Sequence, residues 1–250
     1  MSSSFPMRNM RVRFSGETNI GMKRKHNEDS FILPDFERVA VVADGMGGHA
    51  SGEVASGMAV ESVAAYLKAT LDQSTITWPF KLDQGVRYET NRLVVGIKHA
   101  NQRIYETAQR NDDQHGMGTT IVVLFAVEDG VYCAHVGDSR GYRIRGPKIT
   151  QMTRDHSLLE DYKEAKPDMT EEEQRNFPHK NVITRALGMR DTVQVDIRSD
   201  QIQDGDILLL CCDGLTGMLE DNKMQEIVQA SNGDLEKAVN DLVDGANRNG

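Results

Sequence analysis

The chain of 250 residues is 38% hydrophobic and 27% charged, which is typical of a globular protein and excludes a disordered, collagen-like or wholly coiled-coil chain. Its 38 acidic and 29 basic residues give a net charge of -9, which argues against nucleic acid or an anionic membrane as the main partner. No apolar run is long enough to span a membrane, and the first residues lack the apolar centre of a signal peptide. We therefore expect a cytoplasmic protein whose three cysteines, Cys133, Cys211 and Cys212, are reduced core residues.

The first half of the chain predicts a strand followed by two long helices. Residues 39–43 are apolar, rich in β-branched side chains and followed by Asp44-Gly45, which predicts a buried strand that ends in a turn. Apolar residues then recur at helical spacing from Glu53 to Leu71 and from Leu93 to Ala108. The less periodic stretch around Trp78-Pro79 is expected to connect these two helices as a pair.

The second half predicts mainly strands. Short β-rich runs over 119–127, 131–136 and 141–145 predict an antiparallel meander. The charged segment 157–180 is predicted to be a surface insertion with a short helix, where Thr170 and Glu173 are spaced as in a capping box. A further β region over 193–212 is followed by a C-terminal helix marked by Leu235, Ala238, Val239, Leu242 and Ala246. Since strands and helices are grouped separately and no linker divides the chain, we predict a single α+β domain over residues 1–250.

Three segments have acidic residues in settings suited to a metal site. Asp44 follows a buried strand and precedes glycines that allow backbone carbonyls to turn towards one point. Asp213 likewise follows an apolar run and precedes a glycine. In the third segment Arg24, whose guanidinium fits phosphate oxygens, stands shortly before Glu28 and Asp29. Each segment taken alone is explained at least as well by an ordinary glycine turn or a solvated charged surface.

Taken together, the motifs resemble those of the metal-dependent serine/threonine protein phosphatases of type 2C, particularly their bacterial branch. The likeness covers about residues 12 to 250. Two of the motifs, Gly118-Thr119-Thr120 and Gly137-Asp138-Ser139-Arg140, are predicted to shape strand ends and turns, and no ligand role is predicted for Asp138. In chain order the six motifs are Arg24-x-x-Asn27-Glu28-Asp29, Asp44-Gly45-Met46-Gly47-Gly48-His49, Gly118-Thr119-Thr120, Val136-Gly137-Asp138-Ser139-Arg140, Asp155-His156-Ser157 and Asp213-Gly214-Leu215.

The resemblance implies a four-layer αββα sandwich, in which pairs of antiparallel helices flank two antiparallel β-sheets, with two Mg²⁺ or Mn²⁺ ions at one edge. A third ion, present in many relatives, is left open: Gly217 stands where the family usually has a further acid, so Asp112 or Asp113 would have to substitute for it. The segment 157–180 would be the family's flap, which lies beside the catalytic cleft. The metal ligands would be Glu28, Asp29, Asp44, the carbonyl of Gly45 and Asp213.

The implied reaction is hydrolysis of phosphoserine and phosphothreonine on proteins, in which water activated by the two ions attacks phosphorus. Arg24 would hold the phosphate, and His49 would protonate the leaving oxygen. In eukaryotic members the histidine directly follows the Asp-Gly pair, whereas Met46-Gly47-Gly48 intervene here. The implied partners are phosphorylated protein substrates together with a serine/threonine kinase and its targets. We expect a monomer that acts on neither nucleic acid nor membranes.

One departure from the family pattern leaves alternatives open. The given sequence ends at Gly250, where the family's last Asp-Asn pair and final strand would begin, so one metal carboxylate and at least one strand are expected to be missing after that residue. A catalytically weak or inactive pseudophosphatase that binds phosphoprotein or another partner is therefore the alternative function. A metal-dependent nuclease is a third possibility, against which the net charge of -9 counts.

Overall fold

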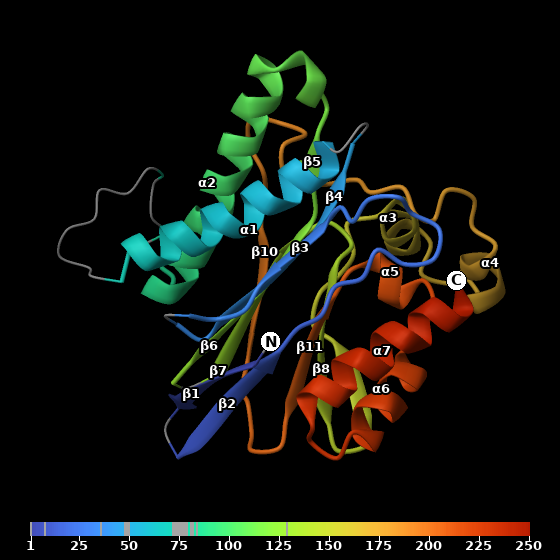
Figure 1. Ribbon diagram of the computed structural model, residues 1–250. Coiled ribbons are helices and arrows are strands. Elements are labelled where there is room, and N and C mark those ends of the chain that lie inside the picture. Colours follow the sequence, from blue (N-terminus) through green and yellow to red (C-terminus); the bar gives the residue numbers. More distant parts are fainter. Residues whose placement is uncertain are drawn as a thin grey trace.

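The computed structural model describes residues 2–7, 9–35, 37–47, 51–71, 80, 83, 85–128 and 130–250. Two antiparallel β-sheets pack face to face, and a pair of helices covers the outer face of each sheet (Figure 1). This is the four-layer αββα sandwich that the family resemblance implied, so the predicted fold class is confirmed.

The larger sheet has the strand order β10-β7-β6-β4-β3, and the short strand β5 pairs with β4. Strands β6 and β7 are buried along their whole length, because helices cover one of their faces and the second sheet covers the other. The predicted strand over 39–43 is confirmed, although it continues through Asp44. The bounds are β3 (Asp29–Ile32), β4 (Val39–Met46), β5 (Gly118–Thr119), β6 (Ile121–Val127), β7 (Gly130–Val136) and β10 (Asp196–Asp200).

The two predicted long helices form the outer layer of this sheet. Helix α1 (Ser51–Ala69) packs against α2 (Tyr88–Arg110) and against β4. Leu71 was expected to belong to the apolar face of the first helix, but it lies beyond Ala69 and is exposed. The apolar face of α2 is buried as the helical spacing predicts, through Leu93, Ile97, Ala100, Ile104 and Ala108.

The smaller sheet has the order β11-β8-β9 and carries α6 and α7 on its outer face. Its strand β11 is apolar on both faces: Leu209 packs towards these helices, and Leu208 and Leu210 pack towards the larger sheet. The C-terminal helix predicted from its apolar spacing is confirmed as α7. The bounds are β8 (Arg140–Arg145), β9 (Lys148–Gln151), β11 (Ile207–Cys211), α5 (Asp213–Thr216), α6 (Asp221–Ala230) and α7 (Leu235–Asn249).

The predicted antiparallel meander is wrong in one respect. β6 and β7 pair as neighbours, but β8 belongs to the other sheet, because β10 occupies the second edge of β7. The chain crosses between the sheets at Gly137, whose φ of 106° is a conformation that favours glycine. A Cβ at this position would lie 2.7 Å from the Cβ of Thr120, so the crossing also requires the absence of a side chain.

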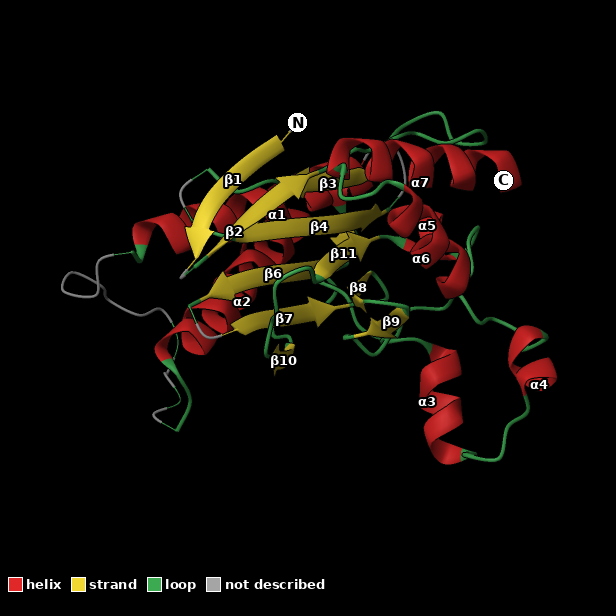
Figure 2. Cartoon of the chain, turned by 90° about the horizontal axis from the view of Figure 1, so that it is seen from below, coloured by secondary structure: helices red, strands yellow, loops and turns green. Residues whose placement is uncertain are grey.

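Three further segments surround the sandwich. An N-terminal hairpin that was not predicted, β1 (Ser2–Met7) and β2 (Met10–Ser15), packs against α7. The predicted insertion contains two helices, α3 (Leu158–Ala165) and α4 (Glu171–Arg175), which lie apart from the sheets (Figure 2). The predicted capping box of Thr170 and Glu173 is present at the start of α4. A 3₁₀ turn, Asp112–Gln114, follows α2. None of the helices in the described part of the chain combines the length and the apolar character needed to cross a membrane.

Candidate metal and phosphate site

The site begins with two carboxylates on neighbouring strands. Asp29 is the first residue of β3, and it is the direct partner of Asp44 in the antiparallel pairing of β3 with β4. Directly opposed residues in such a pair project their side chains from the same face of the sheet. The register therefore places both carboxylates side by side at one end of the sandwich.

Two hydroxyl groups of the Gly118-Thr119-Thr120 motif hold the backbone of Asp44, and a hydroxyl of the Gly137-Asp138-Ser139-Arg140 motif supports one of them. Its N–H donates to Oγ1 of Thr120 at 3.0 Å, and its carbonyl accepts from Oγ1 of Thr119 at 2.9 Å. The Thr120 hydroxyl also lies 2.6 Å from that of Ser139, and both residues are buried. The two motifs thus have the structural role that was predicted for them, and that role is to position Asp44.

Two further acids come from the smaller sheet and from the crossing between the sheets. Asp213 begins α5 and is separated from the end of β11 by Cys212 alone, and Asp138 follows Gly137 in the crossing segment. Burial raises the pKa of Asp44 to about 9, and the negative charges of Asp29 and Asp213 add to this effect. Burial and the charge of Asp213 likewise raise the pKa of Asp138 to about 6. Because Asp213 contributes to the raised pKa values of Asp29, Asp44 and Asp138, these three carboxylates lie within electrostatic reach of Asp213.

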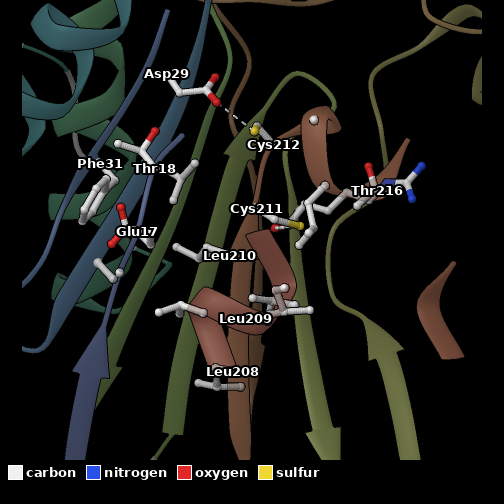
Figure 3. Close-up of a pocket in the computed structure, with 18 of the residues that line it drawn as sticks. Glu17, Thr18, Asp29, Phe31, Leu208, Leu209, Leu210, Cys211, Cys212 and Thr216 are labelled. Carbon is white, nitrogen blue, oxygen red and sulfur yellow. Dashed lines mark hydrogen bonds between the residues drawn. The ribbon is translucent and has the colours of Figure 1, made fainter. Parts of the chain in front are cut away.

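The thiol of Cys212 lies next to these carboxylates. Its Sγ donates a hydrogen bond to Oδ2 of Asp29 at 3.1 Å (Figure 3). The prediction of three core cysteines is therefore correct for Cys133 and Cys211, which are buried, but wrong for Cys212. The apolar run that suggested a core position ends at Cys211, and the following residue caps α5 and faces the acids instead.

Glu28 is brought to the site by a close approach of backbones. The N–H of Gly45 donates to the carbonyl of Glu28 at 3.0 Å. A Cβ on Gly45 would lie 1.9 Å from the carbonyl oxygen of Gly52, so only glycine fits between these segments. The Glu28 side chain is mostly buried and pairs at 3.2 Å with the guanidinium of Arg24, whose own side chain is 75% exposed. This leaves the positive charge of Arg24 accessible at the rim of the site.

A cavity of about 1260 Å³ connects these residues. It is lined by Arg24, Glu28, Asp29, Asp44, Asp138, Cys212 and Asp213, and it continues between β2 and β11 along apolar side chains. The segment predicted to be a flap lies beside it, because Leu159, Glu160 and Lys180 contribute to its wall. The structure therefore brings together Arg24 and every carboxylate that was predicted from the sequence.

One predicted site residue remains untested, and two others were missed by the sequence analysis. His49 lies outside the residues that the structure describes, so its role stays a prediction. Asp138 and Cys212 were not expected to contribute side chains to the site. For Asp138 the sequence offered one signal, the Gly137-Asp138-Ser139 turn, since a sharp turn between strands places its polar residues at the end of a sheet. For Cys212 it offered none.

The donor set suits hard divalent cations. The pKa values of three of its carboxylates, Asp29, Asp44 and Asp138, are raised by burial and by the charge of Asp213. Carboxylates in such a cluster repel one another unless positive charge lies between them. Since oxygen atoms from carboxylates are the ligands that Mg²⁺ and Mn²⁺ prefer, these residues fit such ions well.

Known proteins match this chain in sequence and in fold. The family described as Protein phosphatase 2C matches residues 22–244. The serine/threonine phosphatase stp of Listeria welshimeri is 37% identical over 224 residues, which cover 88% of this chain and 84% of the relative. The structure of the S. agalactiae serine/threonine phosphatase has a TM-score of 0.79 and 32% identity, and the match covers 100% of this chain and 94% of that one.

A further solved structure is that of the catalytic domain of the phosphatase PstP in complex with two manganese ions. It has a TM-score of 0.73 and 28% identity, with 100% of this chain and 91% of that one covered. The chain therefore belongs to the protein phosphatase 2C family, a family of metal-dependent serine/threonine protein phosphatases.

Proposed function

We propose that this chain hydrolyses phosphoserine and phosphothreonine on proteins and uses two Mg²⁺ or Mn²⁺ ions. Residues that would hold the ions are Glu28, Asp29, Asp44, Asp213 and the carbonyl of Gly45. When bound, such ions lower the pKa of water and offset the charge of a phosphoryl group. The observation that carries the proposal is the gathering of carboxylates from separate segments around Asp44, whose pKa is raised to about 9 by burial and, in addition, by the charges of Asp29 and Asp213. The manganese complex of the structural neighbour supports it.

Arg24 would bind the phosphoryl oxygens of the substrate. Its guanidinium is exposed, and its contact with Glu28 at 3.2 Å holds it next to the acids. A guanidinium in this position offers paired N–H donors that match two phosphoryl oxygens. Arg24 would therefore orient the phosphoryl group, while His49 would donate a proton to the seryl or threonyl oxygen as it leaves.

The substrates would be phosphorylated proteins, produced by a serine/threonine kinase whose action this chain reverses. The relatives are serine/threonine phosphatases by name. The flap formed by α3 and α4 would contact the protein around the phosphorylated residue, because Leu159, Glu160 and Lys180 extend the wall of the cavity beyond the acids. We further propose that the chain acts as a cytoplasmic monomer.

Phosphate release from a phosphothreonine peptide tests the proposal. We expect release that requires Mn²⁺ and stops when a chelator is added. Asp44→Asn and Asp213→Asn should each lower turnover by about 100-fold or more, because each removes a charge that holds the ions. Asp241→Asn is the matched control, since this partly exposed acid on α7 pairs with a lysine one turn away and does not line the cavity, and it should retain full activity.

Two outcomes would favour the alternatives. If manganese binds, as measured by calorimetry, but no phosphate is released from phosphoserine, phosphothreonine or p-nitrophenyl phosphate, the pseudophosphatase interpretation would replace this one. If the chain instead cleaves DNA or RNA and Asp44→Asn abolishes that cleavage, the nuclease interpretation would be correct.

A further inference from the structure

A thiol lies among the carboxylates, although hard cations such as Mg²⁺ and Mn²⁺ do not require one. Cys212 Sγ and one carboxylate oxygen from each of Asp29 and Asp44 all lie within 4.8 Å of one another. The Sγ already contacts Asp29 Oδ2 at 3.1 Å, as the dashed line in Figure 3 indicates. Two strands and a helix start hold the three side chains, so the group is built into the fold.

We propose that Cys212, Asp29 and Asp44 form a binding site for a thiophilic divalent cation, namely Zn²⁺, and that Zn²⁺ bound there inhibits the phosphatase. The inference rests on the proposed function, because Asp29 and Asp44 are also proposed to hold the activating ions. Zn²⁺ at the three-residue site would compete with Mg²⁺ or Mn²⁺ for the two carboxylates. Cys212 would thus make this centre selectively sensitive to zinc.

The ligand chemistry supports this assignment. Zn²⁺ accepts sulfur and oxygen ligands together and prefers four of them in a tetrahedral arrangement. One thiolate and two carboxylates supply three, and a water molecule can complete the set. Binding breaks the S–H bond of Cys212, the proton passes to solvent, and a Zn–S bond forms in its place. Mg²⁺ gains nothing from the sulfur, because it binds oxygen ligands almost exclusively.

The other group of potential ligands in the described residues is arranged differently. His135, His156 and Asp196 also lie within reach of one ion. However, Nη1 of Arg185 lies 2.9 Å from Nε2 of His156 and 2.8 Å from Oδ1 of Asp196. Because this guanidinium already supplies a positive charge between them, a metal ion would have to displace it. The group around Cys212 contains no such cation among its hydrogen-bond partners in the described part of the chain.

Cobalt binding tests the site without any measurement of activity. Co²⁺ replaces Zn²⁺ in mixed sulfur and oxygen sites, and a thiolate ligand produces a charge-transfer absorption in the near ultraviolet. We expect this band when the metal-free chain is titrated with Co²⁺, and we expect Zn²⁺ to remove it by competition. Cys212→Ser should abolish the band. Cys211→Ala, which removes the adjacent buried thiol, should retain it.

Zinc inhibition provides the second measurement. With Mn²⁺ present, the Zn²⁺ concentration for half inhibition should rise by about tenfold or more in Cys212→Ser relative to the wild type, each normalised to its own uninhibited rate. Thermal unfolding of each variant establishes that it is folded. A band that persists in Cys212→Ser, or equal zinc sensitivity of the two folded proteins, would overturn the proposal. A normal cobalt band in a chain that never releases phosphate would leave the zinc site intact and reject only the phosphatase function.

Discussion

Asp29 and Asp44 are direct partners across the β3–β4 pairing, so two carboxylates share one face of the sheet at the mouth of the cavity. Burial raises the pKa of both residues, and the charge of Asp29 contributes to the rise at Asp44. This arrangement is costly in the absence of positive charge and favourable when divalent ions are bound. The following predictions concern the groups that hold, extend or surround this pair.

The hydroxyl of Thr120 is expected to position Asp44. Thr120→Val keeps the shape of the side chain but leaves the Asp44 N–H and the Ser139 hydroxyl without this partner. Because both lost contacts are in a buried region, the free energy of unfolding should fall by about 1–3 kcal/mol. Turnover with saturating Mn²⁺ should also decrease. Urea unfolding and phosphate release measure the two effects, and an unchanged midpoint would contradict the structural role.

Arg24 is expected to act on substrate binding. Arg24→Ala should raise the KM for a phosphopeptide by about tenfold, with a smaller change in kcat, because it removes a contact to the phosphoryl group that exists before the reaction. Arg110→Ala is a matched control: Arg110 forms an ion pair with Glu106 at 3.3 Å, also four residues apart, but on helix α2, none of whose residues lines the cavity. An equal KM in the two variants would argue against a phosphate contact.

His49 is expected to protonate the leaving oxygen. A seryl or threonyl oxygen needs that proton, whereas p-nitrophenolate leaves readily without it. His49→Ala should therefore lower kcat for a phosphothreonine peptide by about 100-fold or more, but change kcat for p-nitrophenyl phosphate much less. Measuring both substrates with the same enzyme preparation checks this. Equal losses for both would indicate a role other than proton donation.

Acidic pH should destabilise the fold through His156. Its Nδ1 accepts from the Gly137 N–H, and its Nε2 lies beside Arg185 and Asp196. Burial, with a further contribution from His135, lowers the pKa of His156 from 6.5 to about 4. Between these values the unfolded chain binds a proton that the folded chain does not, so the free energy of unfolding should fall by about 1–3 kcal/mol as the pH decreases from 6.5 to 4.

Urea unfolding at several pH values measures this contribution. In His156→Gln the dependence on pH should be weaker over this range, although His135, whose pKa is also lowered by burial, retains a part of it. His115→Gln serves as the control because this histidine is exposed. Identical pH dependence in the wild type and in His156→Gln would contradict the prediction.

Much of this protein was determined by local patterns in the sequence. Residues 39–43 specify a buried strand, and the spacing of Leu93, Ile97 and Ala108 specifies a covering helix, because alternation and helical periodicity act over short distances. The six motifs, in their order along the chain, identified the family. They also predicted which acidic residues would meet, because the residue types in a motif reflect the chemistry that they perform.

Only the tertiary structure decided which segments meet. The β-rich run at 141–145 reads like a continuation of the preceding strands, yet it joins the other sheet, because the pairing of β10 with β7 leaves no free edge there. The same crossing places Asp138 among the acids, and the end of β11 turns Cys212 towards Asp29. Contacts between residues far apart in the chain depend on sheet order and register, and no local pattern encodes these.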